Sequence, residues 1–385
     1  MKEEWEYKKL GEVASYINGF AFKPSQWSDT GTPIVRIQNL NNPEASYNYY
    51  DGVLPDKVKI KKGDLLISWS ASLGAYLWMG DEAYLNQHIF KVQFDKLDID
   101  KMFLKYAVSS KLDVMANLVH GATMKHIVKS DFDKTRIPYP PKPTQLSIVS
   151  ELDKLNELIQ IKKEQLKDYD ALAQSIFYEM FGDPVENEKG WEVKKLGELC
   201  SKIGSGATPR GGNESYKDEG ISLIRSLNVY NNEFRRKDLA YIDDEQAAAL
   251  SNVTILEDDV LLNITGASVA RCCIVPSDLL PARVNQHVCI IRPFDNVLVP
   301  IFLNKVLTNI SYQIRLLTLA RSKGATREAL PKSVVDSLLV PLPPLSLQQS
   351  FAHKIEQIER QKAEVQKTIT DLETLLAARM QYWFD

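Results

Sequence analysis

The chain has 385 residues, with 47 Lys and Arg against 50 Asp and Glu, and a net charge of −3 at pH 7. This length accommodates two or three domains, and 44% hydrophobic with 25% charged residues is ordinary for a globular protein. No apolar run approaches the roughly 20 residues of a membrane span, and the polar start, Met1–Trp5, lacks the apolar core of a secretion signal. These features exclude a membrane protein and predict a cytoplasmic one.

The second half of the sequence repeats the first. Three strings return at offsets of 186 (191 − 5), 199 (285 − 86) and 203 (340 − 137) residues. The pairs are Trp5–Glu12 with Trp191–Glu198, Asn86–His88 with Asn285–His287, and Ile137–Pro141 with Val340–Pro344. Because a solenoid unit has only about 20–50 residues, this spacing indicates a duplicated domain plus a connector. Two similar domains suit a ligand with two similar halves, and DNA with paired half-sites is the obvious candidate.

Residues 1–143 form the first predicted domain. Short apolar runs such as Pro33–Ile37, Asp64–Ser68 and Ile89–Val92 are separated by Gly and Asn, which predicts strands. A helical pattern covers residues 101–118, so the domain is predicted to be α+β. A proline cluster between residues 138 and 143 ends it.

Residues 144–182 and 346–385 are predicted to form two long helices, with Thr144 and Ser346 as their N-cap residues. Apolar residues recur at alternating spacings of four and three, which is the seam of a coiled coil. Each helix, at about 1.5 Å per residue, is about 55 Å long. Because each follows an equivalent domain, burial of both seams predicts an antiparallel pair. Apolar residues off the seam predict a partner surface, and these are Leu146, Leu158, Phe177, Phe181 and Tyr382.

Residues 183–190 are a predicted linker, and residues 191–345 form the second domain, with a helical patch at 300–318. All four cysteines lie in this domain, and without any Cys-x-x-Cys pair they predict reduced thiols and no zinc site. The predicted fold is therefore α+β, with two pseudo-symmetric globular domains separated by a pair of long helices that form an antiparallel coiled coil. We expect the aromatic segment Met380–Phe384 to pack near the N-terminus of the first domain.

The net charge divides unevenly along the chain. Residues 1–143 carry 19 Lys and Arg against 17 Asp and Glu (+2), and residues 191–342 carry 18 against 17 (+1). Residues 144–183 carry 4 against 8 (−4), and residues 346–385 carry 5 against 6 (−1). The predicted domains are thus mildly basic and the connectors acidic. This permits DNA binding and predicts modest affinity for the chain alone, with a partner supplying part of the phosphate neutralisation.

Further strings recur in the same order in both copies. The first copy has Ile34–Leu40, Gly63–Ile67, Asn86–His88, Gly121–Thr123 and Ile137–Pro141, and the second has Leu223–Asn228, Asp259–Leu262, Asn285–His287, Gly324–Thr326 and Val340–Leu345. Together with Gly204–Pro209 and the flanking helices, they resemble the specificity subunit of type I restriction-modification systems. The resemblance extends over essentially the entire chain.

This resemblance implies a DNA-recognition subunit that is not itself an enzyme. It implies two target-recognition domains that read a bipartite site in double-stranded DNA, and helices that dock two methyltransferase subunits, with restriction or translocase subunits as further partners. No cofactor or metal is expected. The residues agree, because the (Asn/Asp)-Pro-Pro-(Tyr/Phe) string of adenine methyltransferases is missing and Gly206–Asn213 lacks the Lys-Ser/Thr of a phosphate-binding loop. The alternatives are the specificity chain of a related two-part restriction enzyme, a stand-alone DNA-binding protein, and an enzyme in its own right.

Arg36 and Arg225 occupy matching strand ends, where an arginine binds guanine or phosphate; the alternative is a structural arginine paired with a carboxylate. Two loops, near residues 120–126 and 321–327, carry basic and small polar side chains on glycine turns, which let a backbone approach DNA. The predicted DNA contacts are Arg36, Gln38, Asn39, His120, Thr123, Lys125, His126, Arg225, Ser226, Asn228, Arg271, Arg321, Ser322, Lys323, Thr326 and Arg327.

The repeated triplet is the sharpest polar motif in the sequence. It comprises Asn86, Gln87 and His88 in the first copy and Asn285, Gln286 and His287 in the second. Asn and Gln amides can read adenine, but a triplet shared by both domains is a poor reader of two different half-sites. We therefore favour a structural network that caps strand and loop backbone.

Overall fold

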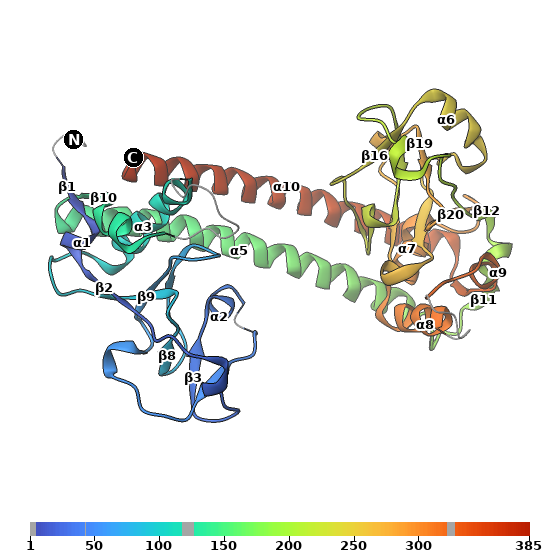
Figure 1. Cartoon of the computed structure of the whole chain (residues 1–385). Helices are drawn as coiled ribbons and strands as arrows, with labels where there is room; N and C mark the ends of the chain where they lie inside the picture. Colours follow the sequence, from blue (N-terminus) through green and yellow to red (C-terminus); the bar gives the residue numbers. More distant parts are fainter. Residues whose placement is uncertain (1–4, 43, 118–126, 322–327) are drawn as a thin grey trace. The chain divides into compact units, whose positions relative to one another are not determined.

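A computed structural model of the chain describes residues 5–42, 44–117, 127–321 and 328–385. The chain divides into two compact units. Unit 1 comprises Met1–Lys163 with Gln366–Asp385, and unit 2 comprises Glu164–Val365. Each unit therefore combines one globular segment with part of both long helices, α5 (Lys142–Phe181) and α10 (Leu345–Phe384) (Figure 1).

Unit 1 contains two four-stranded sheets and a strand pair, with strand orders β2-β9-β6-β7, β4-β3-β8-β5 and β1-β10. Its strands are β1 (Glu6–Lys9), β2 (Ser15–Asn18), β3 (Thr32–Val35), β4 (Asn48–Tyr50), β5 (Lys59–Ile60), β6 (Leu65–Ser68), β7 (Gly74–Leu77), β8 (Ala83–Leu85), β9 (Ile89–Gln93) and β10 (Arg136–Tyr139). Its shorter helices are α1 (Leu10–Val13), α2 (Ile37–Asn41), α3 (Lys101–Asn117) and α4 (Lys129–Lys134).

Unit 2 repeats this scheme, with strand orders β12-β20-β17-β18, β16-β13-β19, β14-β15 and β11-β21. Its strands are β11 (Glu192–Lys195), β12 (Cys200–Ser205), β13 (Ile221–Ile224), β14 (Val229–Tyr230), β15 (Glu233–Phe234), β16 (Ala240–Ile242), β17 (Val260–Asn263), β18 (Cys272–Ile274), β19 (Ala282–Val284), β20 (Val288–Pro293) and β21 (Leu339–Leu342). Its shorter helices are α6 (Asp244–Ala249), α7 (Pro300–Thr308), α8 (Ile310–Arg321) and α9 (Lys332–Asp336). The mixed helix and sheet content and the duplication agree with the predicted fold class.

Strand β6 of the β2-β9-β6-β7 sheet and strand β17 of the β12-β20-β17-β18 sheet are buried on both faces. Successive side chains of a strand point to opposite faces, so Leu65 and Ile67 of β6 join the core that contains α3, while Leu66 joins the core that contains β3 and β8. In unit 2, Val260 and Leu262 of β17 face the core of α7, and Leu261 faces the core of β13 and β19. The sheet that contains β6 or β17 thus lies between a helical layer and the second sheet of its unit, the one that contains β3 and β8 or β13 and β19.

Two of the repeated strings are strand partners. Tyr7 of β1 pairs with Pro138 of β10 in an antiparallel register, and Val193 of β11 pairs with Pro341 of β21 in the same way. The start and the end of each globular segment therefore meet, immediately before the long helix begins.

The two long helices run in opposite directions within each unit. In unit 1, Glu151 of α5 accepts hydrogen bonds from Arg379 and Trp383 of α10, and Lys163 forms an ion pair of 2.7 Å with Glu373. In unit 2, Asp170 of α5 forms an ion pair of 2.7 Å with Lys362, and the Phe177 and Phe351 ring centres are 5.7 Å apart. Residue numbers fall along α10 as they rise along α5, which makes the helix segments antiparallel in both units. The bond from Arg379 holds the pKa of Glu151 below its usual value.

The predicted N-cap residues are wrong, because both helices begin earlier. α5 starts at Lys142, so Thr144 lies in its first turn and donates its backbone N–H to Pro141 at 2.9 Å. α10 starts at Leu345, one residue before Ser346. Prolines precede both starts, and proline is compatible with the first helical turn because that turn leaves its N–H groups without intrahelical partners.

Two of the apolar side chains predicted to face partners are instead buried. Phe177 and Phe181 are only 3% and 2% exposed and pack in the core of unit 2 against Phe302 and Phe351. The expectation failed because this end of α5 is covered by α7 and α10 within unit 2. Leu146, Leu158 and Tyr382 are about half exposed, at 49%, 45% and 51%.

The prediction for the C-terminal aromatic segment is confirmed. Phe384 is fully buried in the core of unit 1, with its ring centre 5.3 Å from that of Phe103. The Trp383 ring stacks on Trp5 at 5.8 Å. The last turn of α10 therefore completes the core of the first globular segment.

The four cysteines are free thiols, and all are buried. Burial raises the pKa of Cys200, Cys273 and Cys289 to about 12 and that of Cys272 well above its usual value. They are therefore protonated core residues. Among the helices that the structure describes, none combines the length and the apolar character needed to cross a bilayer.

Candidate nucleic-acid interface

The arginines at matching strand ends are held by the same kind of contact in both units. The Arg36 guanidinium lies 5.0 Å from the ring centre of Trp27, and that of Arg225 lies 5.5 Å from Tyr216. Arg36 also donates to the Asn48 side chain at 3.1 Å, and Arg225 donates to the Asp238 carbonyl. Both side chains are partly exposed and make no ion pair with a described carboxylate. This differs from the structural alternative, which required a carboxylate partner.

The prediction that Asn39 and Asn228 contact DNA is corrected by their burial, at 3% and 0% exposure. Each side-chain oxygen accepts the backbone N–H of the arginine three residues earlier, at 3.0 Å. The Asn39 amide donates to the carbonyls of Ala45 and Ser46, and the Asn228 amide to those of Arg235 and Lys237. Their donors and acceptors are thus used inside the fold, and they position the arginines. The neighbouring Gln38 is exposed.

The repeated triplet forms the same backbone turn in both units. Asn86 donates its N–H to Val35 at 3.0 Å, and Asn285 donates to Ile224 at the same distance. The turn then closes because the backbone N–H of Ile89 donates to the Asn86 carbonyl, and that of Val288 donates to the Asn285 carbonyl. The side chains differ between units. His287 lies 2.7 Å from the Thr265 hydroxyl, whereas the His88 ring contacts Trp69 at 5.3 Å, and Gln286 is exposed.

A glycine packs against this turn in each unit. A Cβ atom on Gly19 would lie 2.2 Å from the Leu85 carbonyl, and one on Gly206 would lie 2.0 Å from the Val284 carbonyl. Only glycine permits such an approach, because these distances are well inside van der Waals contact. The glycine-rich string that begins near Gly204 therefore serves backbone packing. Sequence reasoning missed Gly19 because one glycine carries no motif.

A groove of about 920 Å³ in unit 2 brings together two of the predicted contacts, Ser226 and Arg271, at the ends of strands. Its lining includes Ser226, Arg271 and His287, from three separate strings of the sequence. The remaining lining residues are Leu227, Tyr230, Thr265, Gly266, Ala267, Ser268, Glu328 and Ala329. We call this the Arg271 groove.

Two guanidinium groups lie over one aromatic ring at the edge of this groove. The Arg271 guanidinium is 4.2 Å from the Tyr230 ring centre, and that of Arg235 is 3.5 Å from it. Arg235 is also bonded to both carboxylate oxygens of Glu233, at 3.0 and 3.1 Å. Tyr230 and Arg235 were absent from the predicted contacts, because only the fold brings the β14–β15 hairpin beside β18.

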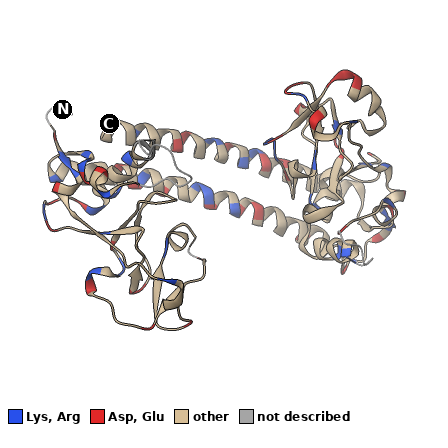
Figure 2. Cartoon of the chain, in the orientation of Figure 1, with Lys and Arg blue, Asp and Glu red and all other residues tan. Residues whose placement is uncertain are grey.

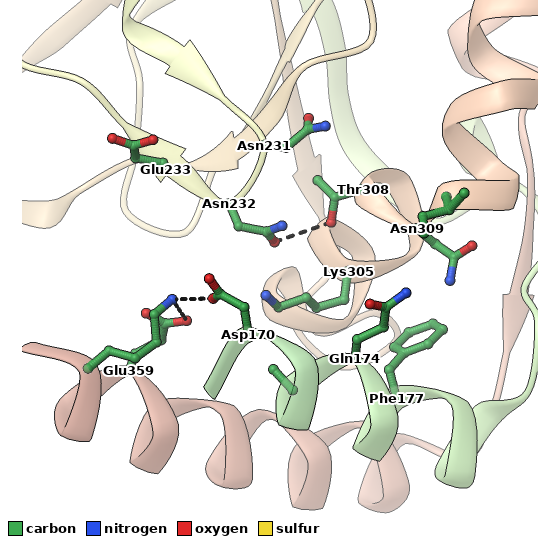
Figure 3. A pocket seen from close by; sticks show the side chains of 13 residues that line it. Asp170, Gln174, Phe177, Asn231, Asn232, Glu233, Lys305, Thr308, Asn309 and Glu359 are labelled. Atoms are coloured by element: carbon green, nitrogen blue, oxygen red, sulfur yellow. Dashed lines mark hydrogen bonds and ion pairs between the residues drawn. The ribbon is translucent and has the colours of Figure 1, made fainter. Parts of the chain in front are cut away.

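A second, polar pocket of about 510 Å³ lies in unit 2 between the hairpin, α7 and the long helices (Figure 3). Lys305 of α7 points into it, and the structure shows no hydrogen bond or ion pair of its ammonium group with a described residue. Burial lowers the pKa of this amine, although Glu359 opposes the effect. Across the pocket, Lys362 is paired with both Asp170 and Glu359.

The remaining predicted contacts lie in or beside segments outside the described residues. His120, Thr123, Lys125, His126, Ser322, Lys323, Thr326 and Arg327 belong to those segments. Arg321 is exposed at the end of α8 and forms an ion pair of 2.7 Å with Glu328. In the view of Figure 2, basic and acidic residues are interspersed over the chain and alternate along the long helices.

Comparisons with known proteins agree with this arrangement. The family model described as "Type I restriction modification DNA specificity domain" matches residues 2–168 and again residues 188–374. The specificity subunit of the type I restriction enzyme EcoBI from Escherichia coli is 24% identical, over 96% of this chain and 82% of its own length. A putative type I restriction enzyme MjaX specificity subunit from Methanocaldococcus jannaschii is 22% identical, over 97% of this chain and 93% of its own length.

Two solved structures share the fold. The S subunit of a type I restriction-modification system from M. genitalium superposes with a TM-score of 0.56 at 14% identity, over 99% of this chain and 96% of that chain. A chain from a structure on complex assembly and conformational transition of the type I R-M system gives a TM-score of 0.62 at 18% identity, over 98% of this chain and 96% of that chain.

Proposed function

The chain belongs to the family of type I restriction-modification DNA specificity domains, and we propose that it is the DNA-recognition subunit of such a system. It selects a bipartite site in double-stranded DNA, and its partners carry out methylation and cleavage in the cytoplasm. The observation that carries this proposal is the duplication, since the family domain occurs twice in one chain and each copy builds a corresponding four-stranded sheet, β2-β9-β6-β7 or β12-β20-β17-β18. Two linked readers suit a split site.

We assign recognition to residues 1–143 and 191–345 and the connection to helices 144–182 and 346–385, with a linker at 183–190. We propose that the helices form one antiparallel coiled coil that holds the two domains apart and sets the spacer between the half-sites. The ion pairs Glu151–Arg379, Lys163–Glu373 and Asp170–Lys362 support this, because they follow one antiparallel progression.

We propose that DNA is contacted by side chains at or near the ends of strands and, for Arg321, at the end of helix α8. Arg36 and Gln38 serve the first domain, and Arg225, Ser226, Arg271 and Arg321 serve the second. Each of these side chains is at least partly exposed. Phosphate contacts fix the register on the duplex and base contacts supply sequence selectivity. The eight predicted contacts outside the described residues remain part of the proposal.

Two methyltransferase subunits, and further restriction subunits, are the proposed partners of the long helices. Four apolar side chains on α5 are 45–50% exposed, and they are the groups that a partner would cover. They are Leu146, Leu158, Ile161 and Leu172. We propose that the reaction rests with those partners.

Co-expression with its methyltransferase subunit in a host free of DNA methylation tests the proposal. Mapping methylated adenine across the genome is expected to give two short specific sequences around a fixed non-specific spacer. Exchange of residues 191–345 for those of a relative is expected to change one half only. A stable complex that methylates an unsplit sequence contradicts the proposal.

A further inference from the structure

We infer that the second domain reads one guanine of its half-site through Arg271, and that Tyr230 is the positioning residue that holds the arginine in place. This inference rests on the proposed function, since it names the base that one groove recognises. The groove, the stacked pair and the difference between the two units each support it.

Arg271 is the arginine of the Arg271 groove whose guanidinium N–H groups are open to a ligand. Its guanidinium lies against the Tyr230 ring at 4.2 Å, and within the described part of the chain no side-chain hydrogen bond or ion pair occupies its donors. The neighbouring Arg235 differs, because its Nε and one Nη group are already bonded to Glu233 at 3.0 and 3.1 Å. Ser226, Thr265 and His287 add hydroxyl and imidazole groups to the same lining.

The chemistry of a stacked arginine favours a base edge. An aromatic ring against the flat face fixes the plane of the guanidinium and leaves its N–H edge open. That edge matches the O6 and N7 acceptors of guanine, which is the commonest specific contact of arginine in the major groove. Holding the side chain before DNA arrives also lowers the entropy lost on binding.

The Tyr230 platform is itself anchored on two sides. The Asn231 side chain accepts the backbone N–H of Cys272 at 3.1 Å, and Asn232 donates its own N–H to the Cys272 carbonyl at 2.9 Å. The Asn232 side chain then accepts a hydrogen bond of 2.9 Å from Asn304 of α7. It accepts a second bond, of 3.2 Å, from Thr308 of the same helix (Figure 3). The hairpin is therefore tied to α7 and to the residue that follows Arg271.

Unit 1 has different chemistry at the equivalent place. The matching registers Ile67 with Ala75 and Leu262 with Cys272 make Gly74 the counterpart of Arg271. The shared bond to the arginine N–H aligns Asn39 with Asn228. Two residues further on the backbones differ, because Asn41 ends the helix α2 whereas Tyr230 lies in strand β14. In place of a stacked cation, Asn41 accepts a hydrogen bond of 2.7 Å from Tyr76. The guanine preference is accordingly expected in one half-site only.

The test uses the full chain in complex with its methyltransferase subunit and maps methylated adenines genome-wide. Arg271→Ala is expected to lower the preference for guanine at one position of one half-site by about tenfold or more, while all other positions keep their preference. Arg271→Lys, which cannot form the bidentate contact, is expected to have a guanine preference between those of the wild type and Arg271→Ala. Tyr230→Phe is expected to retain the preference, and Tyr230→Leu to weaken it.

Arg236→Ala is the matched control. Arg236 is an exposed arginine of the same domain, is paired with Asp278 at 2.8 Å and lies outside the groove lining, so the motif is expected to stay unchanged. Thermal melting and co-purification with the methyltransferase establish that each variant is folded.

Three results overturn the inference. A wild-type motif without guanine in either half does so directly. An Arg271→Ala complex that methylates every site more slowly while the motif is unchanged shows a phosphate contact instead. A folded Arg271→Ala complex with full activity and the same motif shows no contact. In all three cases the split motif itself still supports the proposed function, whereas a wild-type complex without a split motif overturns both.

Discussion

Tyr106 of α3 in unit 1 and Lys305 of α7 in unit 2 occupy equivalent places. Each lies six residues after a residue, Asp100 or Val299, whose backbone N–H donates to the side-chain oxygen of Gln145 or Gln348. Tyr106 donates its hydroxyl to Asp153 of α5 at 2.5 Å and accepts a bond from Asn156. Lys305 instead lies in a polar pocket. The two units thus share a backbone frame but differ in the side chains at corresponding positions. Substitutions at the contacts that build this shared backbone arrangement should therefore reduce stability most in both units.

The largest expected effect concerns a contact that unit 1 makes with the end of α10. Phe384→Ala removes a fully buried ring that packs on Phe103, and such truncations cost about 3–5 kcal/mol. We expect unit 1 to melt first while unit 2 retains its structure, as followed by hydrogen exchange of each unit.

Tyr382→Ala is the control for that prediction, because Tyr382 is 51% exposed and its loss should cost less than about 1 kcal/mol. Equal loss of protection in both units after Phe384→Ala would show that the units do not unfold separately.

The next effect tests the glycine that both units share. Gly206→Ala places a Cβ atom 2.0 Å from the Val284 carbonyl, and the backbone shift that relieves the clash is expected to cost about 3 kcal/mol. Gly19→Ala should behave alike in unit 1. Gly204→Ala is the matched control, since nothing lies within 4 Å of its Cβ position. Urea denaturation measures all three, and equal midpoints for Gly204→Ala and Gly206→Ala would contradict the packing role.

A smaller effect tests the glutamines at the start of the long helices. Gln348 is fully buried, accepts the Val299 N–H at 2.9 Å and donates to the Pro343 carbonyl at 2.9 Å. Gln348→Ala leaves these groups unpaired and is expected to cost about 2 kcal/mol. The exposed neighbour provides the comparison, and Gln349→Ala should melt like the wild type. Gln145→Ala in unit 1 is expected to lower stability in the same way. An unchanged melting temperature for that variant would show that the two buried glutamines do not have equivalent roles.

The smallest effect tests the difference at Lys305. Lys305→Met removes an ammonium group from a half-buried side chain, where burial lowers the pKa of the amine. The substitution is expected to stabilise the chain by about 1 kcal/mol at pH 7, as measured by thermal melting. The exposed Lys354 supplies the control, and Lys354→Met should have little effect.

The sign of the pH dependence follows from the lowered pKa of Lys305. The unfolded chain binds this proton more tightly than the folded chain, so wild-type stability rises relative to the variant as pH increases. The difference should be largest below the folded pKa and vanish above the unfolded value of about 10.4. A difference that is constant with pH would show that the ammonium group is not the cause.

Much of the frame was predictable because it rests on patterns that are local in the sequence. The repeated strings predicted two similar domains, the four-three spacing predicted long helices, and the aromatic segment at Met380–Phe384 predicted a packed end. Helix starts were missed by one or two residues, because each helix begins directly after a proline and before the polar residue that resembles a cap.

The groove depended on tertiary structure. Asn39 and Asn228 have side chains that can read DNA, and only the fold shows that their amides are consumed by backbone groups. Tyr230 and Arg235 belong to a hairpin that the sequence alone does not place beside Arg271. Periodicity and composition act over a few residues and determined the elements and their duplication. The partners of a polar side chain come from distant segments, so which of them are buried and which stay open was decided only when the chain was folded.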